Sequence, residues 1–152
     1  MSETEVMTIG LAAHVAGAII WVGGLFSALV LLPVRVASDS EWRFWDARGR
    51  RLFRWNWVGV ALVFGSGLGM MLLALGGAAP LYVRAMMALG VGAVAIFAYL
   101  FFMPWRRFQW AVAAADRAGA KRQMLRTRIF TGITLAFALI AAVIGASGRH
   151  YG

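Results

Sequence analysis

Six side chains place a metal-ligating or charged group within otherwise apolar sequence. They are His14, Arg84 and two adjacent methionine pairs, Met70–Met71 and Met86–Met87. Thioether sulfur suits a soft ion such as Cu(I), and imidazole and thioether also serve as axial ligands of haem iron. A guanidinium can bind an anion such as a haem propionate. These residue types therefore predict a site for copper or, alternatively, for haem b.

Each of these residues also has a purely structural interpretation. A histidine within a membrane helix can be neutral and hydrogen-bonded to a neighbouring backbone or hydroxyl group. Methionine commonly fills apolar cores, and an arginine near a helix end can extend its charge to the lipid headgroups. His150, close to the C-terminus, is either a further ligand or a solvated terminal residue. The residue types alone leave these alternatives open.

Long apolar segments must position these side chains. The 152 residues are 62% hydrophobic and only 14% charged. Crossing a hydrocarbon core of about 30 Å takes about 20 apolar residues of helix. Four segments meet this requirement, at about 7–32, 57–76, 82–103 and 129–147. We therefore predict an all-α fold in which residues 1–152 form a single integral membrane domain, a four-helix transmembrane bundle of two hairpins embedded in the lipid bilayer.

Positive charge is concentrated between the predicted spans. Residues 33–56 and 104–128, which we expect to be loops, contain thirteen of the fifteen Lys and Arg residues. The positive-inside rule places both segments in the cytoplasm and both termini outside, in the periplasm. The net charge of +9 is then a topological signal, and no nucleic-acid partner is expected. The composition favours a multi-pass protein of the bacterial inner membrane. In this orientation the six candidate residues share the outer leaflet, at similar depths.

Small residues predict how the helices pack, because they allow backbones to approach closely in lipid. Gly10, Gly17 and Gly24 recur on one face of the first helix. The second helix offers Gly59, Gly65, Gly67 and Gly69, of which Gly65 and Gly69 have GxxxG spacing. We expect both faces to form helix interfaces, and we expect proline to end the first and third helices. Tryptophans flank the cytoplasmic ends as an interfacial belt, namely Trp42, Trp45, Trp55, Trp57, Trp105 and Trp110.

The first helix carries a more specific pattern. The run His14-Val15-Ala16-Gly17-Ala18-Ile19-Ile20-Trp21-Val22-Gly23-Gly24-Leu25-Phe26, followed by Leu31-Leu32-Pro33, resembles the first core helix of the CopD family of copper-resistance membrane proteins. The run Arg50-Arg51-Leu52-Phe53 before a glycine-rich helix, and Tyr82 at the start of the next, fit the same plan. The likeness covers about residues 10–105. It implies a protein that binds or passes copper at the periplasmic leaflet, with His14 and the methionine pairs as candidate ligands.

The same His-x6-Trp-x2-Gly-Leu-Phe pattern is also similar to HemJ, a small haem-binding membrane protein that replaces other protoporphyrinogen oxidases in many bacteria. That resemblance implies that His14 is a haem ligand or catalytic residue. It also places Arg84 where the family has a lysine. Whether the chain is an enzyme is left open.

A third hypothesis is a ligand-free accessory subunit of a larger respiratory or transport complex, and a homo-oligomer is also expected. The chain contains no cysteine, which excludes disulfides and thiolate sites. It has neither paired carboxylates nor a glycine-rich phosphate loop with a lysine, so the sequence disfavours hydrolysis and phosphoryl transfer.

Overall fold

A computed structural model describes residues 3–33, 38–74 and 80–148. Within these ranges all regular structure is helical and no strand occurs, and four long helices are apolar enough to cross a membrane. The predicted all-α bundle of four membrane-length helices is confirmed. The elements are α1 (Glu3–Leu31), α2 (Asp39–Ala74), α3 (Leu81–Leu100), the π-helical turn η1 (Phe101–Trp105), α4 (Arg106–Ala113) and α5 (Arg117–Ser147).

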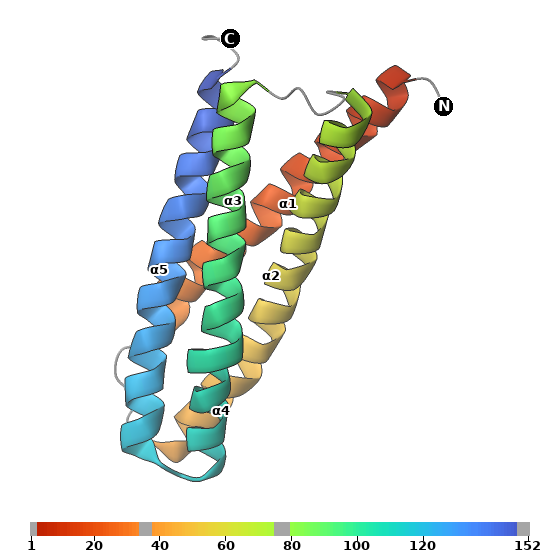
Figure 1. The fold of residues 1–152 in the computed structure, drawn as a ribbon. Coiled ribbons are helices and arrows are strands. Elements are labelled where there is room, and N and C mark those ends of the chain that lie inside the picture. Colours follow the sequence, from red (N-terminus) through yellow and green to blue (C-terminus); the bar gives the residue numbers. More distant parts are fainter. Residues whose placement is uncertain (1–2, 34–37, 75–79, 149–152) are drawn as a thin grey trace.

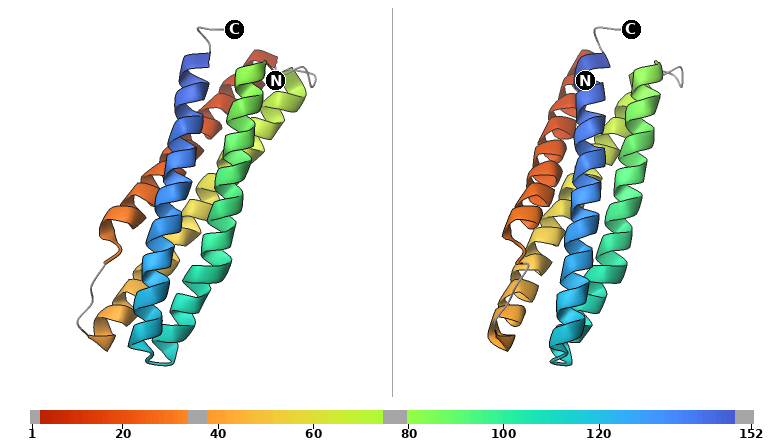
Figure 2. Two further views of the ribbon diagram at one scale, coloured as in Figure 1. Left: turned by 60° about the vertical axis from the view of Figure 1, so that its left-hand side comes forward. Right: turned by 90° about the vertical axis from the view of Figure 1, so that its left-hand side faces the viewer.

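The helices pair as two hairpins, as predicted. Helix α1 packs on α2, and α3 packs on α5, and Figures 1 and 2 show α3 and α5 side by side in every view. Helix α1 begins and helix α5 ends at the same end of the bundle, which we call the terminal end. The opposite end, where α2 and α5 begin, is called the basic end. Figure 1 shows the α1–α2 pair leaning away from α3 and α5 toward the terminal end.

The arginine-rich segments are mostly helical, so the expectation of two long loops was wrong. Helix α2 has 36 residues and is therefore about 54 Å long, well beyond the length that a hydrocarbon core requires. Its first half is amphipathic, because Trp42, Asp46, Gly49 and Phe53 are buried at spacings of three or four residues. Packing of this face makes helix more favourable than loop despite the charged residues between.

Aromatic rings form the core of the basic end. The Trp105 ring stacks on Phe108 with centroids 5.1 Å apart, Phe53 lies 4.9 Å from Trp105, and Trp42 meets Phe108 edge-on at 5.8 Å. Trp42 and Trp105 are 5% and 1% exposed, so these two are core residues, and their expected place in an interfacial belt was wrong. Trp55 and Trp110 remain strongly exposed, as residues of such a belt would be.

Proline has different effects in the two hairpins. Pro33 follows the end of α1, as expected, but Pro104 does not end the third helix. It lies inside η1, and the chain continues directly into α4. A π-helical turn accommodates the missing N–H by shifting the hydrogen-bond register. The shift keeps Pro104 and Trp105 buried against the other helices.

The glycine face of α1 is a close helix contact, as predicted. A Cβ atom on Gly17 would lie 2.9 Å from the backbone nitrogen of Val63 and 3.0 Å from the carbonyl oxygen of Gly59. On α2, however, a Cβ on Gly65 or Gly69 would meet no atom within 4 Å. Of the four glycines expected at the interface on α2, Gly59 and Gly67 do face α1. The expectation was wrong for the GxxxG pair, because Gly65 and Gly69 lie on another face of the helix. We call the contact between α1 and α2 the seam.

Candidate functional site

His14 lies half-buried in the seam, beside Ser66 of α2. Its Nδ1 is 3.2 Å from the Ser66 hydroxyl oxygen, which in turn donates to the Leu62 carbonyl at 2.5 Å. Since the hydroxyl has one proton and gives it to Leu62, its oxygen accepts from His14 Nδ1–H. With Nδ1 as the donor, Nε2 of an uncharged imidazole would be the nitrogen that could bind a metal. Metal-bound histidines are commonly held this way, with the second ring nitrogen donating to a fixed acceptor.

Met70 occupies the same seam, about one turn nearer the terminal end. A Cβ on Gly10 would lie 2.9 Å from Met70 Cγ and 3.4 Å from its sulfur, and a Cβ on Gly67 would lie 3.2 Å from His14 Cε1. Each candidate ligand thus fills the space left by a glycine of the opposite helix. His14 and Met70 thus lie along the same helix contact, about one turn apart, and the two helices could not approach as closely with larger residues at positions 10 and 67.

The second methionine pair lies in the other hairpin. Met86 packs on α5, where its sulfur would be 2.6 Å from a Cβ on Gly145. Met71 and Met87 are half-buried neighbours of Met70 and Met86 on α2 and α3. The structure therefore joins His14 to the first pair through the seam, while Met86 faces a different helix contact.

Arg84 lies near the start of α3 with an exposed side chain, on the opposite hairpin from His14. Nothing in the described contacts connects it to the seam. His150 is outside the residues that the structure describes. Among the described residues, no group of three or more His, Asp or Glu side chains could hold a metal ion.

Two polar atoms in the seam are buried without a partner among the described residues, Trp21 Nε1 and Asn56 Oδ1. Asn56 is fully buried and lies against Gly24, while its amide nitrogen donates to the Leu52 carbonyl at 3.0 Å. The sequence did not single out Asn56 or Ser66. An amide or hydroxyl within an apolar helix was the available signal, since such groups in lipid are costly unless they bond.

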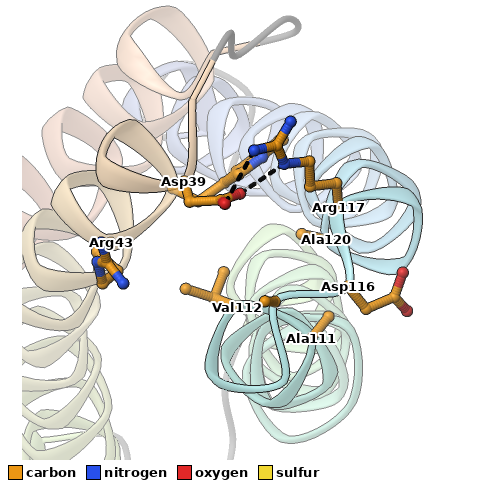
Figure 3. Close-up of a pocket in the computed structure, with 9 residues that line it drawn as sticks. Asp39, Arg43, Ala111, Val112, Asp116, Arg117 and Ala120 are labelled. Carbon is orange, nitrogen blue, oxygen red and sulfur yellow. Dashed lines mark hydrogen bonds and ion pairs between the residues drawn. The ribbon is translucent and has the colours of Figure 1, made fainter.

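The basic end has its own polar contacts, formed between helices far apart in sequence. Asp46 is 6% exposed and accepts from Arg50 and, at 3.1 Å, from the Gln109 amide. Figure 3 shows the exposed pair of Asp39 and Arg117, in which Arg117 Nε and Nη2 donate to the two carboxylate oxygens at 2.7 and 2.9 Å. This bidentate pair joins the first residues of α2 and α5. It lines a small hollow of about 50 Å³ together with Arg43 and residues of the α4–α5 turn.

Asp116 begins α5 and does not take part in that pair. Its carboxylate accepts from the Gly119 backbone N–H at 2.9 Å, which caps the helix. In Figure 3 its side chain points away from Asp39. Ala115, just before it, has a φ of 54°. The polar contacts at this end thus stabilise helix starts and a tight turn.

Comparison with family models, with curated proteins and with solved structures finds no match to this chain. The fold and the membrane-spanning character therefore rest on the sequence and structure themselves. The resemblances to CopD and HemJ proteins remain predictions.

Proposed function

We propose that this membrane protein binds Cu(I) in the seam between α1 and α2, close to the terminal end. The observation that carries the proposal is the placement of His14 and Met70, each fitted against a glycine of the opposite helix. Nitrogen from imidazole and sulfur from thioether are ligands suited to Cu(I).

Three features of the chain fit this ion. The Ser66 hydroxyl contacts His14 through Nδ1, Met70 supplies a soft sulfur about one turn away, and Met71 is adjacent to it. The chain offers no thiolate, which suits an exchangeable rather than a permanently held ion. Met86 and Met87 would serve as a second position to which copper passes in the other hairpin. In this proposal the protein holds or relays copper at one leaflet.

Haem b is the alternative, with His14 as an axial ligand and Arg84 at a propionate. A porphyrin could not lie between His14 and Met70 without separating the two helices. Their backbones already meet at Gly17, less than one turn from His14. Arg84 belongs to the other hairpin. The arrangement thus supports a single soft ion better than a macrocycle, and an absorption spectrum of protein produced with sufficient haem tests the alternative directly.

The test is copper content and Cu(I) affinity of the purified protein under reducing conditions. We expect about one tightly bound Cu(I) per chain, and a loss of affinity of at least tenfold in His14→Ala and in Met70→Leu. Leucine has nearly the volume of methionine, so the second variant removes sulfur with little change in packing. The matched control is Met124→Leu, which changes a buried methionine of the core far from the seam.

Three results would contradict the proposal: no bound Cu(I) in the unaltered protein, unchanged affinity in both seam variants, or equal loss in the control. If Met86→Leu, rather than Met70→Leu, abolished binding, the ion would belong to the α3–α5 hairpin instead. A Soret band in place of copper would favour haem.

We also propose that the basic end faces the cytoplasm and the terminal end the periplasm of a bacterial inner membrane. The distribution of arginine supports this orientation. It would place copper binding at the periplasmic leaflet, where Cu(I) from outside could be received. We also propose that the chain forms a homo-oligomer or joins a larger membrane complex. Light scattering tests the first and co-purification tests the second. A monodisperse, copper-bearing chain would exclude the ligand-free accessory role.

A further inference from the structure

A surface hollow of about 400 Å³ lies beside α2 near the basic end, well away from the proposed copper site. Its lining is Arg51, Arg54, Trp55 and Val58. These positions share one face of α2, because residues three, four and seven apart lie together on a helix. The hollow therefore places two guanidiniums and an aromatic ring directly above an apolar surface.

The two arginines have no protein partner in the described residues. Elsewhere at this end Arg50 and Arg117 bind aspartates, Arg128 donates to a backbone carbonyl, and Arg48 lies over the Phe44 ring. Arg51 and Arg54 make no hydrogen bond, ion pair or ring contact with any residue in the described ranges. They lie one turn apart on a helix about to enter the apolar span. Their charge is thus available to an external anion at the depth of lipid headgroups.

The same face of α2 continues toward the middle of the bundle with unusually little side chain. Below Val58 it presents Ala61, Leu62, Gly65 and Gly69, and a Cβ on either glycine would meet nothing within 4 Å. From Val58 to Gly69 the helix rises about 16 Å, roughly half of a hydrocarbon core. The bare strip formed by Gly65 and Gly69 could receive an acyl chain against the helix backbone, bordered by leucines 62, 68 and 72, which are exposed.

Helix α5 provides a natural contrast. Arg122 and Arg126 are also exposed and one turn apart at the basic end. The face below them carries Ile129, Ile133 and Ile140, all exposed. The charge spacing is therefore similar, but bulky side chains replace the bare strip. Only α2, of these two helices, combines a pair of cations with a groove for a chain.

We propose that this face of α2 is a binding site for one anionic phospholipid, with its phosphate on Arg51 and Arg54 and an acyl chain along Ala61, Gly65 and Gly69. Guanidiniums bind phosphate oxygens through charge-assisted, often bidentate hydrogen bonds. Trp55, 58% exposed, covers the glycerol region, the depth that tryptophan prefers. The site lies in the leaflet at the basic end.

The test is reconstitution into vesicles of equimolar dioleoyl phosphatidylglycerol and dioleoyl phosphatidylcholine, followed by native mass spectrometry of the detergent-extracted protein. We expect one retained phosphatidylglycerol on the unaltered chain. Each arginine near an anionic headgroup contributes about fivefold, so Arg51→Gln with Arg54→Gln should lower the preference for phosphatidylglycerol roughly 25-fold. Gly65→Leu with Gly69→Leu should lower retention while leaving every charge in place.

Matched controls distinguish a site from general attraction. Arg122→Gln with Arg126→Gln removes the same charge, and Gly23→Leu fills another position with nothing within 4 Å of its Cβ; both should retain the lipid. All positions are exposed or open, and circular dichroism verifies the fold. Should a glutamine variant misfold, Arg51→Lys with Arg54→Lys preserves charge, removes the guanidinium geometry and should still weaken retention.

Several outcomes would overturn the proposal. Equal loss in the α2 and α5 arginine variants would mean a diffuse electrostatic effect. Full retention of the lipid in the leucine variant would show that its acyl chain does not lie along Gly65 and Gly69. Displacement of the lipid by inorganic phosphate alone would identify a free anion as the occupant. Because the chain has no cysteine, efficient disulfide-linked dimerisation of Gly65→Cys in membranes would show that a second copy covers this face.

Discussion

The closest point of the seam gives the sharpest test of the fold. We predict that Gly17→Ala destabilises the protein because the added methyl group meets α2 backbone atoms that cannot rotate away. Its Cβ would lie 2.7 Å from Leu62 Cβ and 2.9 Å from the Val63 nitrogen, whereas ordinary contact begins at 3.4 Å. Helices α1 and α2 must therefore separate by about 0.5 Å at this point, and overpacking of this kind costs about 1–3 kcal/mol.

Gly23→Ala is the matched control on the same helix. No atom lies within 4 Å of its added Cβ, so only the helix propensity changes, by up to about 1 kcal/mol in favour of alanine. Both variants gain this helix-propensity term. The difference between their free energies of unfolding therefore measures the cost of the close contact between α1 and α2. Unfolding by sodium dodecyl sulfate in mixed micelles, followed by far-ultraviolet circular dichroism, measures the difference.

A double variant tests whether the cost of Gly17→Ala comes from contact between the two helix backbones or from a change confined to α1. Gly59→Ala would place a Cβ 2.8 Å from the Trp21 nitrogen, on the other side of the same contact. Once one alanine has separated the helices, the second needs little further movement, so the double variant should cost less than the two single variants together. Equal stability of Gly17→Ala and Gly23→Ala, or strict additivity with Gly59→Ala, would refute the close backbone contact.

Three further predictions concern the basic end. Gly49→Ala should cost about 1–3 kcal/mol and change tryptophan emission, because its Cβ would overlap the Trp105 ring; unchanged emission and stability would contradict that packing. Asp46→Ala should cost about 1–3 kcal/mol, since the Gln109 amide loses its acceptor, and Asp46→Asn should cost less in the same unfolding assay. Asp39→Asn should lower the melting temperature only slightly, and only at low salt, because the ion pair with α5 is exposed; a shift that persists in 1 M salt would contradict a screened surface pair.

The spans were predictable because hydropathy and charge are sums over a segment and need no knowledge of neighbours. Where the helices end was not, because that depends on contacts between distant segments. From composition, residues 39–56 were predicted to belong to a charged loop. They are helical because Phe53 and Gly49 pack against Trp105, more than fifty positions later. The same contacts bury Trp42 and Trp105, which composition alone assigned to the interface.

The same distinction applies to the candidate site: the depth of its residues was predictable from the sequence, but their contacts were not. Depth follows from counting residues along a helix, so His14 and Met70 could be assigned to similar levels from the sequence. The direction in which each side chain points depends on which helices pair. This separates Met86, which packs against α5, from Met70, which packs against α1. Ser66 escaped notice because a single hydroxyl has no pattern. Its partner became visible only when the seam brought His14 beside it.

Glycine spacing shows why a packing motif identifies a surface without naming its occupant. A GxxxG pair promotes close approach because it removes side chains, but the same removal exposes backbone to lipid when no helix arrives. In α1 the glycines at 10, 17 and 24 meet α2, and in α2 Gly59 and Gly67 return that contact. Gly65 and Gly69 lie on another face, below unpaired arginines. The positive charge at the end of the strip therefore favours a lipid over a second helix as its occupant. A phosphate can bind two guanidiniums, whereas an apolar helix cannot.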